Sequence, residues 1–346
     1  MSASSQAPRS AAVDSPKSRS WRAAISPYQR PVLSKSLWQL ANTLGVYVLL
    51  WAVMFVTSRS SFWLTLPFAI LAGGFLVRVF IIFHDCTHNS FFRSRRANEF
   101  WGSLTGVLCF TPYHHWKWEH AVHHAHSGDL DQRGFGDVWT LTVDEYLAAA
   151  KFTRLRYRLI RNPVVLFLLA PIFLFFVLHR FPTRGAGARA IRSVHLTTLA
   201  LICMACALAA IFGWQTFLLI QFIVMFVAAS AGVWLFYVQH QFEGVEWERN
   251  ENWDFAAAAL RGSSFYRLPR ILQWFSGNIG FHHLHHLSPQ IPNYHLERCH
   301  KTHPLFGTVP EITLRSSLRS FHFRLWDEQE RRLVGFAHLR KINSRF

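Results

Sequence analysis

The sequence predicts an all-α, multi-pass membrane protein with four transmembrane helices. Two observations lead to this prediction. The 346-residue chain is 51% hydrophobic, and residues 193–242 contain no Asp, Glu, Lys or Arg. A soluble chain averages about one charged residue in four. This composition excludes disordered, collagen-like and small disulfide-stabilised proteins.

The predicted spans follow from the positions of the apolar runs. The run at residues 193–242 is too long for one helix, since about 20 apolar residues cross the hydrocarbon core. It should therefore fold as a hairpin that turns near Gly213 and Trp214. Two further runs precede it and are separated by a short turn. We place the four spans at about residues 36–58, 62–83, 195–213 and 216–238.

A fifth apolar run, residues 162–178, has basic residues on both sides. Lys151, Arg154, Arg156, Arg158 and Arg161 precede it, and Arg180, Arg184, Arg189 and Arg192 follow it. Because cytoplasmic flanks of membrane helices collect Lys and Arg, both ends are expected on the cytoplasmic side. We therefore predict an embedded or interfacial hairpin that does not span, interrupted near Pro171. Both termini and the histidine-rich segments are then cytoplasmic.

The regions outside the spans complete the expected organisation. Residues 1–35 are rich in Ser, Ala, Pro and Arg without an apolar segment, which is typical of a disordered cytoplasmic tail. Residues 36–308 are expected to form the membrane domain, with additional interfacial helices such as the one expected near residues 101–110. Residues 309–346 form a basic C-terminal tail.

Most of the 20 histidines lie within residues 84–126 and 282–303. Three groups have helical spacing: His84 and His88; His120, His123 and His124; and His282, His285 and His286. Offsets of three and four residues bring imidazoles onto one helix face, where they can converge on a metal. Eight such ligands exceed one tetrahedral site, which indicates two metals held in a cytoplasmic helical cap. Spacing alone permits zinc, whereas the neighbouring lipid-facing helices favour a redox metal.

Further polar residues lie near these groups. His240, at the end of the last span, would emerge on the same side and is a candidate ninth ligand. His295 and Asn278 are candidates for hydrogen bonds that fix imidazole tautomers. Asp85, Asp129 and Glu243 fit that role and fit capping or solvated roles equally well.

The motifs resemble the membrane-bound fatty acid desaturase family, in particular its acyl-lipid omega-6 (delta-12) branch. The resemblance covers about residues 84–303, and hydropathy extends it back to about residue 36. The resemblance rests on four segments: FHDCTHNSFF at 83–92, PYHHW at 112–116 followed by HAVHH at 120–124, FYVQHQFE at 236–243, and HHLHH at 282–286 followed by LSPQIPNYH at 287–295. Thr87 stands where the family usually has glycine, and the segment after Phe242 is unfamiliar. Neither departure removes a ligand, but both leave substrate and regiochemistry open.

The resemblance implies an oxidoreductase with a non-haem di-iron centre. The two iron ions would be ligated by the eight box histidines with His240 in the additional position, with no catalytic residue separate from these ligands. O2 and two external electrons would introduce a cis double bond into an acyl-lipid or fatty-acyl substrate. No fused redox domain is evident in the sequence, so a separate ferredoxin or b-type cytochrome is the expected electron donor.

The charge balance bears on partners and location. The chain has 36 Lys and Arg against 19 Asp and Glu, a formal charge of +17. With spans this apolar, the excess indicates membrane lipids and not nucleic acid as its partner. We expect an integral membrane protein, in the bacterial inner membrane in preference to the endoplasmic reticulum.

Two other classes of function remain open on sequence grounds. A di-iron lipid hydroxylase, or a carotenoid ketolase or hydroxylase, would use the same histidine boxes. A membrane metal transporter would instead require ionisable residues within the spans. The uncharged run at residues 193–242 opposes the transporter.

Overall fold

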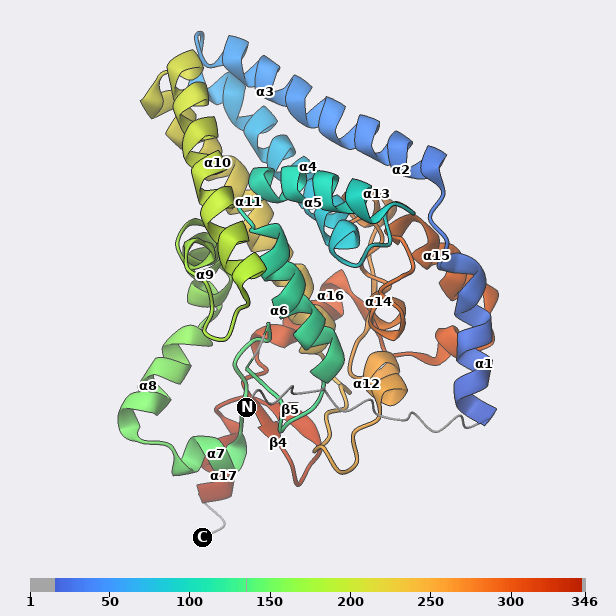
Figure 1. Ribbon diagram of the computed structural model, residues 1–346. Coiled ribbons are helices and arrows are strands. Elements are labelled where there is room, and N and C mark those ends of the chain that lie inside the picture. The colour runs from blue at the N-terminus through green and yellow to red at the C-terminus, as the bar shows by residue number, and fades with distance from the viewer. Residues whose placement is uncertain (1–15, 135, 344–346) are drawn as a thin grey trace, which may run out of the picture.

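The computed structural model describes residues 16–134 and 136–343, which are mostly helical (Figure 1). Four helices in this part of the chain are long and apolar enough to cross a membrane. They are Leu33–Thr57, made of α2 (Leu33–Leu40), a π-helical turn (Ala41–Gly45) and α3 (Val46–Thr57); α4 (Phe62–Thr87); α10 (Ala188–Phe212); and α11 (Trp214–His240). The predicted all-α class with four transmembrane helices is confirmed.

Short turns with defined backbone geometry join the helices of each pair. The Ser61 hydroxyl accepts a hydrogen bond from the backbone N–H of Trp63 at 3.2 Å and so caps α4. Gly213 joins α10 to α11 with a φ of 80°, a conformation that glycine adopts without strain. The hairpin therefore turns where the sequence indicated.

Helix α4 is the central span. In the most apolar 18-residue stretch of α4, 61% of the residues are buried. The corresponding share for α10 is 17%, so α10 faces outward along most of its length. Gly73 of α4 lies directly against Val227 of α11, and a Cβ added at Gly73 would lie 2.6 Å from the Cβ of Val227. This close approach depends on the missing side chain.

Gly73→Ala is expected to lower the unfolding temperature of the purified protein in detergent. In an unobstructed helix the same change stabilises by about 1 kcal/mol, whereas forcing a methyl group into a filled contact costs about 1–3 kcal/mol. Gly232→Ala is the matched control on α11, because nothing lies within 4 Å of its added Cβ. An unfolding temperature for Gly73→Ala at or above that of Gly232→Ala would contradict the packing.

The fifth apolar run does not fold back as the hairpin that we expected, but forms one helical stretch that meets the preceding helix at a bend. Helix α8 (Lys151–Ile160) is followed by a π-helical turn (Val165–Leu169), α9 (Ala170–Phe176) and a 3-10 turn (Leu178–Arg180). The two parts meet at an angle of 61°. The break surrounds Pro163, whose ring cannot continue α8, while Pro171 fits into the first turn of α9.

The remaining helices form a cap at one end of the spans (Figure 1). They are α1 (Pro16–Ile25), α5 (Arg95–Leu108), α6 (Tyr113–His126), α7 (Val143–Ala148), α12 (Phe255–Arg261), α13 (Arg270–Phe275), α14 (His282–Leu287), α15 (Asn293–Thr302), α16 (Leu314–Ser317) and α17 (His338–Asn343). Of the expected N-terminal tail, residues 1–15 lie outside the described residues. The rest begins with α1, whose Ile25 is buried in one apolar cluster with Leu284 and Leu296.

Short strands bind the C-terminal segment to the cap. Strand β1 (Leu141–Thr142) pairs in parallel with β4 (Leu325–Asp327), which pairs antiparallel with β5 (Arg332–Val334). Strand β2 (Phe265–Arg267) pairs in parallel with β3 (Glu311–Thr313). The segment that we expected as a basic tail thus contributes to the folded cap, with Trp326 buried.

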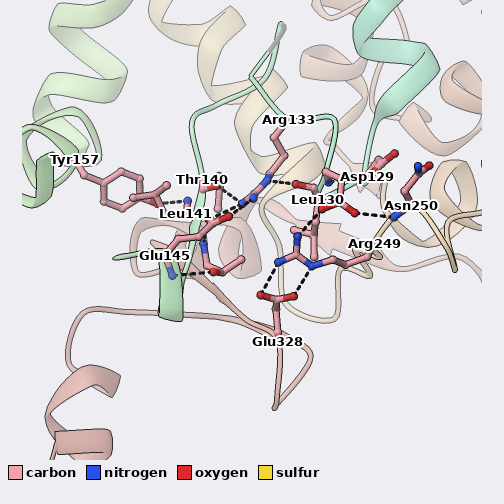
Figure 2. A network of polar contacts seen from close by, with 12 residues as sticks. Asp129, Leu130, Arg133, Thr140, Leu141, Glu145, Tyr157, Arg249, Asn250 and Glu328 are labelled. Carbon is pink, nitrogen blue, oxygen red and sulfur yellow. Dashed lines mark hydrogen bonds and ion pairs between the residues drawn. The ribbon is translucent and has the colours of Figure 1, made fainter. Parts of the chain in front are cut away.

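Two arginines tie the loops of the cap to this sheet (Figure 2). Arg133 forms a bidentate pair with Glu145, with N–O distances of 2.5 and 3.1 Å, and donates to the carbonyl of Thr140 at 2.8 Å. Arg249 forms a second bidentate pair with Glu328, at 2.9 and 3.0 Å. Bidentate geometry fixes orientation as well as distance, so the loop after α6 is held in place.

A third arginine, Arg161, is fully buried at the end of α8. Its guanidinium donates to the Tyr237 hydroxyl at 3.2 Å, to Oε1 of Gln241 at 3.0 Å and to the carbonyl of Phe323 at 3.2 Å. Arg161 therefore joins α8, the end of α11 and the C-terminal segment at one point.

Candidate metal centre

Four separate parts of the chain bring the predicted histidines together. The end of α4 supplies His84 and His88, and α6 supplies His120, His123 and His124. The last residue of α11 is His240, and α14 supplies His282, His285 and His286. Eight of the nine side chains are buried, and His88 is half-buried.

The nine imidazoles form two adjoining groups. In the first histidine group, one ring nitrogen from each residue lies within 4.8 Å of the others; its members are His84, His88, His120, His124 and His285. The second histidine group contains His123, His240 and His286, with the same limit. His282 adjoins this second group, since its Nε2 lies 2.9 Å from Nε2 of His240 and 3.1 Å from Nε2 of His286.

Two histidines, His120 in the first group and His282 beside the second, have contacts that fit a bound cation better than hydrogen bonds. Nε2 of His120 lies 3.1 Å from Nε2 of both His84 and His124, and Nε2 of His282 has two such neighbours as well. An imidazole nitrogen carries either one proton or one lone pair, so it cannot donate to one neighbour while accepting from another. Two nitrogens bound to one metal at about 2.1 Å and 90° apart would lie about 3.0 Å from each other.

Other ring nitrogens in the groups are buried without a hydrogen-bond partner among the described residues. They include Nε2 of His88, His123 and His285. A buried polar atom without a partner costs free energy, and a bound cation would remove that cost. The donor set therefore fits two metal ions that accept imidazole ligands.

Burial keeps these rings in the form that binds metals. It lowers the pKa of the histidines outside the spans well below the usual value, and neighbouring imidazoles lower it further; the residues are His88, His120, His124, His282, His285 and His286. A neutral imidazole has a free lone pair, so the groups are prepared for coordination near neutral pH.

Carboxylates fix the orientation of two of these rings. Nδ1 of His123 lies 2.5 Å from Oδ1 of Asp137, and Nδ1 of His84 lies 3.3 Å from Oδ1 of Asp85. A carboxylate at Nδ1 holds the proton there and leaves Nε2 free as the ligand atom. Asp85 also accepts from the backbone N–H and the side-chain amide of Asn293, at 2.7 and 2.8 Å, which joins α4 to the start of α15.

Asp137 was missed in the sequence analysis, whereas Asp85 was one of its candidates. Asp137 lies in the loop after α6, where helical spacing says nothing about contacts. The available signal was Gly136, which has a φ of 67° and whose added Cβ would lie 3.1 Å from the Cβ of His123. A glycine beside an aspartate in this loop allows the backbone to approach α6 closely.

The other polar candidates lie in different contacts. Asp129 accepts from the backbone N–H of Asp131, and exposed Glu243 pairs with Arg319. Asn278 donates to the carbonyl of Asn293. His295 packs against Tyr28 and Tyr294, with ring centroids 6.3 and 4.9 Å away. Asp129 and Glu243 therefore have the capping and solvated roles that the sequence left open.

Aromatic rings cover parts of both groups. Trp116 stacks on His120 with ring centroids 4.1 Å apart. The ring centroid of Phe236 lies 5.2 Å from that of His123 and 5.4 Å from that of His240. These rings place apolar surface beside the nitrogens and limit access of water to them.

Comparison with known proteins gives one consistent result. The family model described as fatty acid desaturase matches residues 61–312. The chain is 48% identical to a fatty acid desaturase of Bacillus subtilis over 318 residues, which cover 92% of this chain and 90% of the relative. Two Synechocystis proteins are also similar. One is an sn-1 oleoyl-lipid 12-desaturase, 28% identical over 69% of this chain and 68% of its own. The other is an sn-1 acyl-lipid omega-3 desaturase (ferredoxin), 29% identical over 76% and 74%. The chain therefore belongs to the fatty acid desaturase family, whose members are oxidoreductases acting on fatty acids.

Proposed function

We propose that this protein introduces a cis double bond into the acyl chain of a membrane lipid, and that the nine histidines hold two iron ions. The main observation is the pair of buried imidazole groups at the end of a lipid-facing helix bundle. The overall reaction removes two hydrogens from adjacent methylenes. It reduces O2 to two waters with two electrons and two protons. When bound, the iron would supply the oxidising power that an unactivated methylene requires.

The side chains of this protein have three tasks in that reaction. The imidazoles supply neutral nitrogen ligands, and Asp85 and Asp137 hold His84 and His123 in the ligating tautomer. Trp116 and Phe236 cover the site and exclude water. The apolar surface of the spans gives an acyl chain a route from the bilayer without exposure to solvent.

We further propose that both termini and the metal centre face the cytoplasm of a bacterial inner membrane. The basic flanks of the apolar run at residues 162–178 support this orientation. A separate ferredoxin or b-type cytochrome would supply the electrons. One relative carries ferredoxin in its name, and the positive net charge suits an acidic donor. Residues 36–308 would form the catalytic domain, joined by strands from the segment after it.

Gas chromatography of lipids from a host expressing the protein tests the reaction. The expected product is an unsaturated fatty acid that is absent from the empty-vector host and from a host expressing His286→Ala. An added hydroxyl or keto oxygen without a new double bond would replace this proposal with a hydroxylase or ketolase. Metal uptake by cells without any lipid change would favour a transporter.

Asp137→Ala is expected to weaken iron retention by about 10- to 100-fold, the usual effect of removing a carboxylate that orients a ligand. Asp137→Asn keeps an oxygen acceptor for Nδ1 of His123 and should retain more iron than the alanine variant. The measurement is iron per chain in the purified protein after timed exposure to a chelator. Exposed Asp144→Ala is the control, and equal iron loss in all three variants would contradict a positioning role.

A further inference from the structure

Helix α8 has its apolar side facing outward. Phe152, Leu155 and Leu159 are 76%, 55% and 56% exposed, and their spacing of three and four residues puts them on one face. The opposite side is the one that packs on the protein. There Tyr157 is fully buried, accepts from the backbone N–H of Leu141 at 3.1 Å and packs against Trp139. A helix on a soluble surface would have the reverse arrangement.

The charges of α8 border this apolar stripe. Lys151 and Arg156 are exposed and, at about 100° per residue, lie roughly 70° to either side of it. Arg154 and Arg158 add two more cations, and the sequence of α8 contains no acidic residue. Arg158 donates to the Tyr146 hydroxyl at 2.6 Å, which holds its head at the border of the helix. An apolar face bordered by Lys and Arg is typical of a helix that lies in the membrane interface.

The chain next to α8 continues the same surface. After the 61° bend, Val164, Leu169 and Phe173 are exposed along the apolar segment that leads to α9. Its buried side, with Phe167, packs against Trp234 and Tyr237 of α11. Figure 1 shows α8 beyond α9 and to one side of the span bundle. Ten residues with four cations cannot cross hydrocarbon at low cost, so the bend separates a surface helix from an inserted one.

We propose that α8 is an in-plane membrane helix that binds anionic phospholipids. Phe152, Leu155 and Leu159 enter the acyl layer, while Lys151 and Arg156, one on either side of the stripe, bind lipid phosphate groups. Lipid phosphate groups match these cations in charge and in position. When the apolar stripe inserts shallowly, the side chains on either side of it reach the depth of the phosphate groups. This anchor holds one side of the cap against the lipid surface. It depends on neither the metal nor the reaction.

The depth of the stripe can be measured on the full-length protein in vesicles of phosphatidylcholine with phosphatidylglycerol. Phe152→Cys is labelled with an environment-sensitive dye in a background in which exposed Cys203 and Cys206 are replaced by Ser. The control label is at Asp144→Cys, an exposed polar position on α7. Spin-labelled acyl chains should quench the dye at 152 and aqueous iodide should not, with the opposite result at 144.

Two outcomes would overturn the inserted stripe. Iodide quenching at 152 as strong as at 144 would place the stripe in water. Protection at 152 from both quenchers would mean that protein covers it, such as a second copy of this chain.

The headgroup contact is tested by removing charge. With Lys151→Gln and Arg156→Gln together, the dye at 152 should lose its dependence on the phosphatidylglycerol fraction and on salt. Arg298→Gln with Lys301→Gln removes the same charge from exposed positions on α15 and should leave that dependence intact. The recognition of anionic lipid would be overturned if the two double variants showed the same dependence on phosphatidylglycerol. It would also be overturned if the dye at 152 gave the same signal in pure phosphatidylcholine as in the mixed vesicles.

Discussion

Replacing His120 or His282 with alanine is expected to reduce desaturation below detection and to lower the iron bound per chain. The Nε2 atom of each residue has two Nε2 neighbours from other histidines at 2.9–3.1 Å. On the proposed function, its removal would take away a ligand and leave those neighbours without a shared cation. His120 lies inside α6 and His282 at the first position of α14, both outside the membrane spans, so membrane insertion and expression should not change.

His126→Ala on the same helix as His120 is the control, because His126 lies outside both groups. Iron is measured by elemental analysis of protein purified from the membrane fraction, beside the fatty acid profile of the host. Full desaturation by either His120→Ala or His282→Ala would contradict the metal assignment. Loss of the protein from the membrane fraction would show that the histidine is needed for folding.

Arg161→Met is expected to cause the largest loss of stability among single changes outside the metal groups. The substitution leaves the buried side-chain oxygen of Gln241 without its donor, and it removes one of the donors to the Phe323 carbonyl and a partner of Tyr237. Each unsatisfied buried group costs about 1–3 kcal/mol. Because Tyr237 and Gln241 flank His240 in sequence, bound iron should decrease with stability.

Thermal unfolding in detergent measures this effect. Arg184→Met, at an exposed position, is the matched control with the same loss of charge. Arg161→Lys should be intermediate, since one ammonium cannot reproduce the planar set of guanidinium donors. Equal unfolding temperatures for Arg161→Met and Arg184→Met would show that the buried contacts add nothing to stability.

The sequence predicts the spans, and the histidines that the fold brings together, because both depend on local periodicity. An apolar run without charge has few alternatives to a membrane helix. Histidines three and four residues apart share a face whatever the rest of the chain does. His240 was identified in the same way, from its position at the end of a span.

The rest depended on contacts distant in sequence. Asp137 reaches His123 through a loop, and no spacing rule covers that geometry. The pairing of β1 with β4 joins three-residue or shorter segments that are far apart in the chain, and such segments have no detectable period. The hairpin expected at residues 162–178 failed for a different reason, because charge distribution indicates on which side a segment ends and not how it bends.

The order of the ligands along the chain also bears on how the protein is made. The first histidine group needs His285, and the second needs His286, although α4, α6 and α11 are synthesised long before α14. A nascent chain that has inserted all four spans therefore still has two open groups. On the proposed function, neither group is complete before α14 has been synthesised, so binding of metal by the complete groups would follow synthesis of all four spans.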